Sequence, residues 1–529
     1  MKHGIYFSEN SSSIQAATQV SQSLTVALGT AEKITDKPQL IYTLSEYTEK
    51  FGKGGTLDEV AQVLFGIYQI SPAVFVNVLD KSKHFKEVEK EFAEVTTFKL
   101  TGNVDSDTVK ITTGEYIPAV ELENGGDFEV IRNEDTDADT GEVTVDVQFK
   151  LLDASKLNGG VKITYRTLST ALGGEPVETE VTLAEGATFA LASDTVVESV
   201  TASSIEINTL KNVGFAMEGD TVTLFLGVIL VDGKIKVTYH EIDATKVTGE
   251  DIIGALDQLE SVYARFNLTP GIIIAPEFSL KNDVAAALAN KAKNLDCMAI
   301  NDIDAESYTD AIERKNAQGL AHSNLITCFP KVTLEGNEYF LSTHLAALMN
   351  VVDFDSDDIP YQSPSNKNLM IDGAVSNGKE IYLNQEQANL LNAAGIVTAF
   401  SYTNWKCWGN FTSMGEDNDY KDKFISVRRM CNFLKWYFRL TYFQSLDQPV
   451  NLRQVEAILQ SANIYLGTLA SRGILLGGRL EFNESENPTT ELQNGALHFN
   501  LYILPPPPMQ EINISLEIDL NYFDTLFAQ

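Results

Sequence analysis

A broad apolar arc with a narrow basic edge is the most distinctive pattern in the chain, and it lies in residues 424–443. At about 100° per residue, one side of a helix over this stretch would be apolar. That side holds Val427, Met430, Cys431, Phe433, Leu434, Tyr437, Phe438 and Leu440. The cations Arg428, Lys435 and Arg439 fall together on the opposite side. The pattern predicts a long helix: either a core helix with a solvated charged edge, or a helix whose basic edge faces a partner.

Short apolar runs alternate with amphipathic segments over the first 95 residues. Strands are expected at 24–29, 38–42 and 73–79, because these runs are short and rich in buried-type residues. Helices are expected at 45–52 and 58–67, where a Ser or Asp precedes a helical apolar set. The order strand, strand, helix, helix, strand predicts one α/β unit.

Period-two alternation dominates residues 96–245, which are rich in Thr, Val, Gly and acidic residues. Turn residues recur between the alternating runs, as in an all-β sandwich or barrel. The segments 158–165 and 232–239 resemble each other, which suggests either two related β-units or hairpins repeated within one unit. Asp135, Asp137 and Asp139 lack the Gly and terminal Glu of a calcium loop, so a solvated acidic loop is the favoured interpretation.

The strand and helix alternation returns from residue 252. Strands are expected at 271–276, 297–302 and 325–329, with helices at 283–292 and 307–317. Such strands predict a mainly parallel sheet covered on both faces.

An active site in such a sheet would lie at the carboxyl ends of the strands, where Glu277, Asn301 and Asp302 stand. No nucleophile, His partner or glycine fingerprint accompanies them. Loop carboxylates and helix caps are therefore the favoured interpretation.

Both ends of the chain predict extended arms. Gly4, Ile5, Tyr6 and Phe7 form a short strand candidate before a Ser-rich segment. Residues 512–520 alternate strictly and follow a stiff run of prolines at 505–508. One face of that strand candidate is apolar, with Ile512, Ile514, Leu516 and Ile518.

Composition narrows the possible functions. The 529 residues carry a formal net charge of −34, which argues against nucleic acid or an anionic membrane as the main partner. No run of 18 apolar residues is long enough to span a membrane, and no secretory signal is visible. The six His and four Cys show no metal-binding or redox spacing, so we expect no metal, no cofactor and no catalytic residues.

One ordered set of motifs resembles a known family. Trp408-Gly409-Asn410-Phe411-Thr412, followed after a polar loop by Val427-Arg428-Arg429, resembles the C-terminal domain of contractile tail sheath proteins of myophages and R-type bacteriocins. That family usually has Arg where Phe411 stands. The N-terminal start, the 360–366 loop, Asn487-Pro488 and the proline-rich tail also resemble the family.

The resemblance implies a structural subunit that polymerises around an inner tube and contracts to drive the tube through a target cell envelope. The implied partners are further copies of the chain, a tail tube protein, and baseplate and tail terminator proteins, without nucleic acid or membrane anchoring. Assembly in the bacterial cytoplasm, followed by a place in a phage virion tail or a released bacteriocin particle, is also implied. Within the polymer, both arms would add strands to the sheets of neighbouring subunits, and Arg428, Lys435 and Arg439 would face the tube.

The expected fold class is a multidomain α+β and α/β protein: mixed α/β core domains, an inserted all-β domain and two extended arms. The expected divisions are an arm at 1–20, α/β parts at 21–95 and 246–375, the β insertion at 96–245, a C-terminal domain at 376–508 and an arm at 509–529. The alternatives are a surface-binding adhesion protein whose β insertion binds a ligand, and an enzyme with an unrecognised site. Hollow tubes under the electron microscope would distinguish a sheath subunit from both.

Overall fold

The structure is a computed structural model. It describes residues 22–520, except residue 36 and most of the connections between strands in the range 94–233. The chain divides into two units, one made of residues 1–80 and 246–529 and the other of residues 81–245. Each unit is described by itself.

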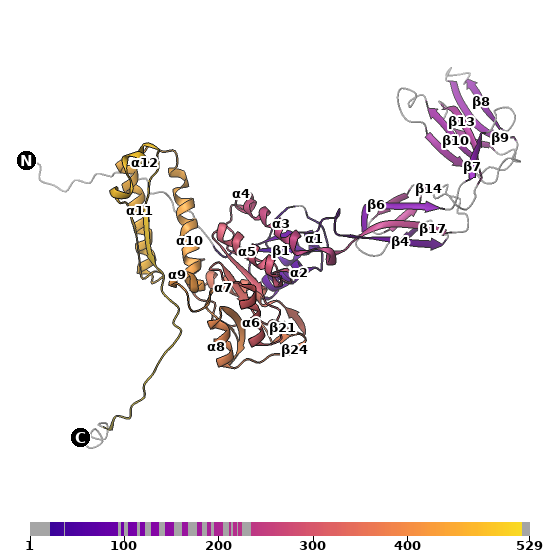
Figure 1. The fold of residues 1–529 in the computed structure, drawn as a ribbon. Helices are drawn as coiled ribbons and strands as arrows, with labels where there is room; N and C mark the ends of the chain where they lie inside the picture. The colour runs from indigo at the N-terminus through magenta and orange to yellow at the C-terminus, as the bar shows by residue number, and fades with distance from the viewer. Residues whose placement is uncertain are drawn as a thin grey trace, which may run out of the picture. The chain divides into compact units, whose positions relative to one another are not determined.

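An eight-stranded sheet forms the centre of the first unit (Figure 1). Its order is β2-β3-β1-β18-β19-β20-β25-β26. The strands are β1 Thr25–Gly29, β2 Gln39–Ile41, β3 Ala73–Asn77, β18 Ile272–Ile274, β19 Met298–Asp302, β20 Leu325–Cys328, β25 Ile396–Ser401 and β26 Trp405–Trp408. All inner pairings are parallel, and only the edge strands β2 and β26 run antiparallel to their neighbours. The predicted mixed α/β class with a mainly parallel sheet is confirmed.

Helices pack on this sheet because their apolar residues face it. They include α1 Leu44–Phe51, α2 Thr56–Ala61, α5 Asn282–Asn294, α6 Tyr308–Gln318, α7 Leu341–Phe354 and α8 Gln385–Ala393. Helix α7 is almost wholly buried, and its leucines join Leu57 of α2 in the main core. Helix α1 begins at Leu44, and its N-cap is Thr43, whose side chain accepts from the Glu46 N–H, rather than Ser45 as the sequence suggested. A small antiparallel sheet has the order β22-β21-β23-β24. Its strands are β21 Lys331–Leu334, β22 Asn337–Tyr339, β23 Gly373–Ser376 and β24 Lys379–Glu380.

A helical hairpin makes a second layer of the first unit. Helix α10, Ile425–Tyr442, and helix α11, Leu452–Ser471, share a core that includes Met430, Leu434 and Leu466. The two-stranded sheet β27 Gly477–Glu481 and β28 Asn500–Leu504 packs beside α11 (Figure 1). The predicted long helix is therefore present, with its apolar arc buried.

The central sheet contains strands from both sides of the predicted division between residues 375 and 376. Strands β25 and β26 lie beyond that division, yet β25 pairs with β20, and β26 pairs with β25 and closes one edge of the central sheet. The chain from 396 to 408 therefore belongs to the α/β core. Sequence order could not show this, because the pairing of β25 with β20 joins segments far apart in the chain.

The second unit contains only strands among its described elements, from β4 Phe85–Ala93 to β17 Lys234–Ile242. These two strands pair along their whole length, so the unit begins before the expected boundary at residue 96. Strands β10 Val161–Thr167 and β17, which hold the two similar segments, lie in different sheets. Of the three aspartates considered for calcium, only Asp135 lies in a described strand, β8 Phe128–Thr136.

Candidate assembly interfaces

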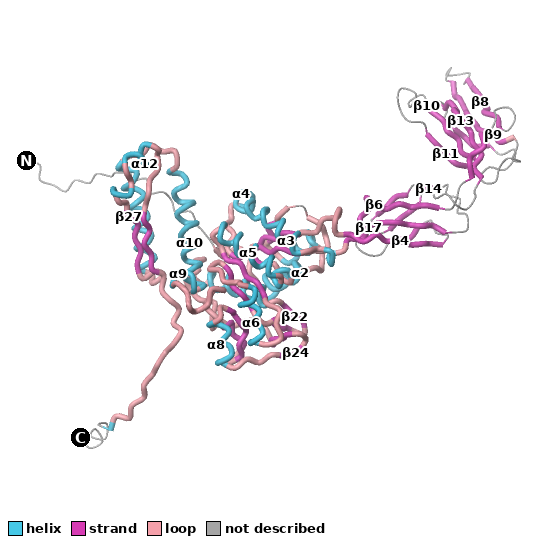
Figure 2. The backbone as a smooth tube through the Cα atoms, viewed as in Figure 1, coloured by secondary structure: helices cyan, strands magenta, loops and turns pink. Residues whose placement is uncertain are grey.

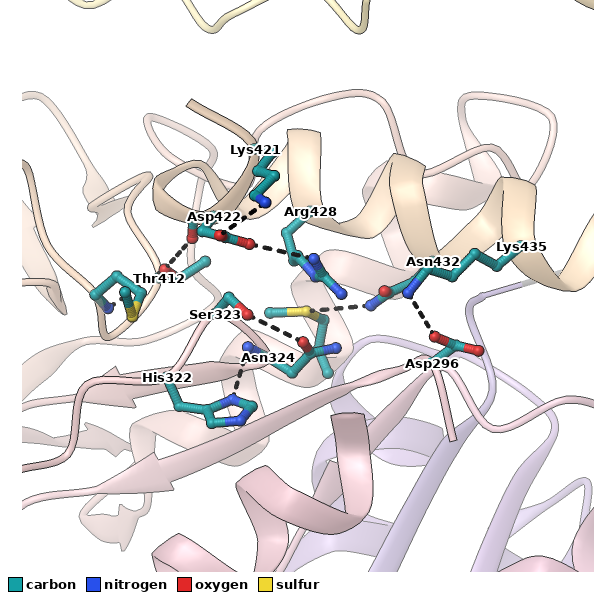
Figure 3. Close-up of polar contacts among 12 residues, drawn as sticks. Asp296, His322, Ser323, Asn324, Thr412, Lys421, Asp422, Arg428, Asn432 and Lys435 are labelled. Atoms are coloured by element: carbon teal, nitrogen blue, oxygen red, sulfur yellow. Dashed lines mark hydrogen bonds and ion pairs between the residues drawn. The ribbon is translucent and has the colours of Figure 1, made fainter. Parts of the chain in front are cut away.

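The basic edge of α10 has acidic partners within its own chain. Lys435 Nζ lies 2.8 Å from Asp296 Oδ1, and Arg439 Nη2 lies 2.7 Å from Asp296 Oδ2. Figure 3 shows Lys435 pointing toward Asp296. Asp296 is nearly buried, whereas the side chains of Lys435 and Arg439 are about half exposed, at 47% and 49%. Two half-exposed cations on one carboxylate leave a net positive edge at the surface.

Arg428, the third member of this edge, is mostly buried. Its Nη1 atom donates to Asp422 Oδ1 at 3.2 Å, and only 13% of its side chain is exposed (Figure 3). Nearby His322 has a lowered pKa because the ring is partly buried and because Lys293 and Arg428 repel its cationic form. For Arg428 the geometry favours the alternative of a core helix with a charged edge. Contact of the three cations with a tube stays a prediction.

Arg429 makes a buried ion pair within the chain that sequence reasoning missed. Its guanidinium makes two hydrogen bonds to the Asp353 carboxylate and donates from Nη2 to the Gln22 carbonyl at 3.1 Å. Both charged side chains are almost fully buried. The Ser23 hydroxyl also donates to Asp353, at 3.4 Å. The pair therefore holds Gln22 and Ser23, just before β1, against α7 and α10. A signal was present, because Arg429 lies about 40° from Phe433 around the helix.

The Trp-Gly-Asn motif forms a tight junction between β26 and α10. Gly409 has a φ of 134°, and a Cβ there would lie 2.9 Å from Val397 Cα, so only glycine fits. The Asn410 N–H donates to Asn392 Oδ1 at 2.9 Å, which ties the junction to α8.

Local packing explains why Phe411 stands at the position where the family that this chain resembles usually has Arg. Its ring is buried and lies 5.4 Å from the ring of Phe424, in a small cluster that includes Val427. The hydroxyl of the next residue, Thr412, donates to the Asp422 carbonyl at 2.6 Å. An apolar side chain at position 411 is therefore part of the packing between the motif and α10.

The C-terminal tail is described as far as residue 520 and forms no strand (Figure 2). Its apolar side chains are strongly exposed: Ile512 71%, Ile514 86%, Leu516 86%, Ile518 81% and Leu520 66%. The expected strand over 512–520 is not formed in the single chain, because a strand needs a partner to be stable. Gly4, Ile5, Tyr6 and Phe7 of the other expected arm lie outside the described residues.

Carboxylates do gather at the carboxyl ends of the parallel strands. Burial raises the pKa of Asp302 to about 6, although the Ser342 N–H donates to its Oδ1 atom. Burial also raises the pKa of Glu59 to about 7, and the nearby Asp302 adds to the effect. Asn301 accepts a hydrogen bond from Thr327 at 2.9 Å. Glu277 has a positive φ of 68°.

Among the residues that the structure describes, no group of three His, Cys, Asp or Glu is placed to hold a metal ion. No helix in the same part of the chain is both long and apolar enough to cross a membrane.

Comparison with curated proteins finds phage proteins among the relatives, although no family model matches the chain. The tail sheath protein of Burkholderia phage BcepMu is 28% identical over 316 residues, which are 55% of this chain and 66% of that protein. A putative prophage major tail sheath protein of Pseudomonas aeruginosa is 24% identical over 263 residues, which are 48% of this chain and 66% of that protein. The matches thus span just under two thirds of each relative.

Two solved structures share the fold over nearly the whole chain. The baseplate of the anti-feeding prophage in its contracted state contains a chain with a TM-score of 0.53 and 13% identity, covering 97% of this chain and 98% of that one. Its helical sheath in the contracted state gives a TM-score of 0.51 at 11% identity, covering 98% and 99%. The protein is a homologue of phage tail sheath proteins and has the fold of a contractile sheath subunit.

Proposed function

We propose that this chain is the structural subunit of a contractile tail sheath. It polymerises around an inner tube, and contraction of the polymer drives the tube through a target cell envelope. The observation that carries the proposal is the 28% identity to a phage tail sheath protein over 316 residues. The shared fold supports it, and neither comparison supports the adhesion alternative.

The work of contraction comes from two packings of the same subunit. A sheath held in the less stable packing stores free energy, and a trigger releases it by allowing neighbours to repack. No nucleotide or cofactor is required, and the role is structural rather than enzymatic. The proposed partners are the tail tube, the baseplate and a tail terminator, in a particle assembled in the bacterial cytoplasm and carried as a phage tail or a released bacteriocin.

Strand addition by the arms keeps neighbouring subunits connected while they repack. The tail presents alternating apolar side chains without a partner, as a strand donor should. The sheet β27-β28 has only two strands, and Leu501, Tyr502 and Leu504 of β28 are exposed. It is the acceptor in this proposal, since added strands would cover that apolar surface. Residues 4–7 of the N-terminal arm add in the same way.

Residues 81–245 form an independent all-β domain on the outer surface of the sheath in this proposal. The support is that the unit contributes no strand to the eight-stranded sheet. It is also outside the motifs that resemble sheath proteins. In an outer position, this domain takes no part in the contacts between the α/β cores of neighbouring subunits.

Negative-stain microscopy of the purified chain tests this function. The full chain should form hollow tubes, and a chain ending at residue 510 should remain monomeric, because it lacks the donor strand. A chain ending at residue 520 is the matched control and should still form tubes, since it keeps the whole alternating segment. Compact particles from the full chain at every concentration, with or without purified tube, would overturn the proposal.

A further inference from the structure

The segment between β28 and the exposed tail is seated on the body of its own subunit. Pro505 is buried, Pro506 and Pro508 are partly buried, and Pro507 is exposed. From Met509, which is 81% exposed, every described residue is exposed. The chain therefore leaves the body near residue 510, not at the end of β28.

Two hydrogen bonds hold this segment at its ends. The Tyr420 hydroxyl donates to the Pro505 carbonyl at 2.5 Å, and Gln510 Nε2 donates to Asn410 Oδ1 at 3.2 Å. Asn410 is itself oriented by Asn392, whose Nδ2 atom also donates to Asn410 Oδ1, at 3.4 Å. Asn410, the last residue of the Trp-Gly-Asn motif, thus contacts the start of the tail.

Proline chemistry explains why the tail does not simply extend β28. Pairing of β28 with β27 runs to Leu504, opposite Gly477. The next four residues are prolines, which have no N–H to donate to a ladder and which favour a stiff extended helix. The ladder must stop at this point, and the strand-forming residues beyond are carried away from their own sheet.

The middle of the segment is not fixed by close packing. It borders a cavity of about 840 Å³, which is lined on the other side by polar groups including Lys367 and Asn389, and by Trp408. Because the cavity leaves room beside the prolines, the two terminal hydrogen bonds determine the path of the segment.

We propose that Tyr420 and Asn410 are positioning residues that clamp residues 505–510 to their own subunit, so that the free arm begins at Glu511 with a fixed direction. This inference rests on the proposed function, since a direction matters only if the arm docks on a neighbour. Fixing the start of the arm lowers the entropy cost of docking the arm on a neighbouring subunit. Residues 511–520 then reach roughly 33 Å, at about 3.3 Å per residue.

Two bonds in the tail provide a test with an internal control. Glu511 and Glu517 are both exposed and both followed by Ile, so a Glu-specific protease meets the same pair of residues twice. A protease binds several residues on each side of the bond that it cuts, so a clamped 505–510 segment should protect the bond after Glu511 but not the bond after Glu517. Mass spectrometry of the released peptides gives the ratio of the two cleavage rates in the monomer.

The Tyr420→Phe, Asn410→Ala double variant should raise cleavage after Glu511 relative to Glu517 by roughly fivefold or more, because each lost hydrogen bond favours the open state. Gln510→Ala removes one of the two bonds from the exposed side and cannot disturb the body, so it should give a smaller increase even if the double variant folds poorly. Tyr502→Phe is the control and should leave the ratio unchanged, because the Tyr502 ring lies by Arg479 rather than by the proline segment.

An unchanged ratio in both the double variant and Gln510→Ala would overturn the clamp. A raised ratio with tubes forming as fast as in the parent chain would overturn the positioning role. A raised ratio with slower tube formation supports it. If instead the chain ending at residue 510 still forms tubes, the proposed role of the arm fails, while the proteolysis result stands independently.

Discussion

Arg429 and Asp353 form a buried ion pair that joins α10 to α7 across the central core. One guanidinium nitrogen lies 2.8 Å from Asp353 Oδ1, and the side chains are 1% and 0% exposed. The same guanidinium holds the carbonyl of Gln22. Three segments far apart in sequence therefore meet at one charge pair, which holds the residues just before β1.

Removal of one partner of this pair should be severe. Arg429→Met leaves a buried carboxylate without its cation, which costs about 3–5 kcal/mol of unfolding free energy. Arg439→Met, on the same helix, is the matched control: its half-exposed ion pair with Asp296 contributes about 1 kcal/mol or less. Urea denaturation measures the loss of unfolding free energy in each variant. Equal losses would show that the buried pair contributes no more to stability than the half-exposed pair.

The raised pKa of Glu59 predicts a pH-dependent stability. Burial raises this pKa from 4.5 to about 7, so between those values the folded chain binds more protons than the unfolded chain. Stability contributed by this group is therefore highest at acid pH and is lost as the pH rises to 7. Glu59→Gln keeps an acceptor for the Phe340 N–H and removes the charge.

The variant should accordingly gain roughly 2 kcal/mol relative to the parent chain between about pH 5 and pH 8. The difference between the two chains is the quantity to measure by denaturation, because the many surface carboxylates affect both equally. A difference that does not vary with pH would contradict the raised pKa.

Deletion of the second unit should leave the first unit folded. None of its strands belongs to the eight-stranded sheet, so a short Gly/Ser linker in place of residues 81–245 removes no core strand. The shortened chain should melt cooperatively and form tubes. A variant that folds but never forms tubes would place these residues within the lattice and not on its outer surface.

The half-exposed cations of α10 provide a test of the tube-facing prediction. Lys435→Glu with Arg439→Glu reverses the surface charge, whereas Arg428 is left intact because its burial against Asp422 makes it a folding residue. Co-assembly with purified tube should weaken, and in the parent chain it should weaken with added salt, since exposed charges are screened. Normal co-assembly of the double variant would refute contact with the tube at this edge.

Local patterns were enough to predict much of the fold. The short apolar runs at 24–29, 73–79, 271–276, 297–302 and 325–329 all contain strands of the central sheet, and the 424–443 arc contains α10. A buried parallel strand has an apolar sequence whatever its neighbours are, so it can be recognised from the sequence alone.

Contacts between distant residues could not be predicted in this way. Asp296 partners Lys435 and Arg439, and Asp353 partners Arg429, only because the fold brings α10 beside β19 and α7. A basic edge that looks free in sequence is therefore partly neutralised. For the alternating tail, in contrast, the local pattern predicts a strand, but a single chain does not supply the partner that the strand needs to form.

The N-terminal arm supplies the last prediction. Its proposed strand, residues 4–7, lies before the point where Gln22 and Ser23 are held by Arg429 and Asp353. Removal of residues 1–12 keeps that anchor and every described core contact. The melting temperature should therefore change by less than about 2 °C, a shift that corresponds to roughly 1 kcal/mol or less. The truncated chain should stay monomeric, because the proposed donor strand has been removed while every described core contact is kept. Removal of residues 8–12 alone, which shortens the Ser-rich segment but keeps the strand, is the control and should retain some tube formation. Normal tubes from the 1–12 truncation would refute strand addition by this arm.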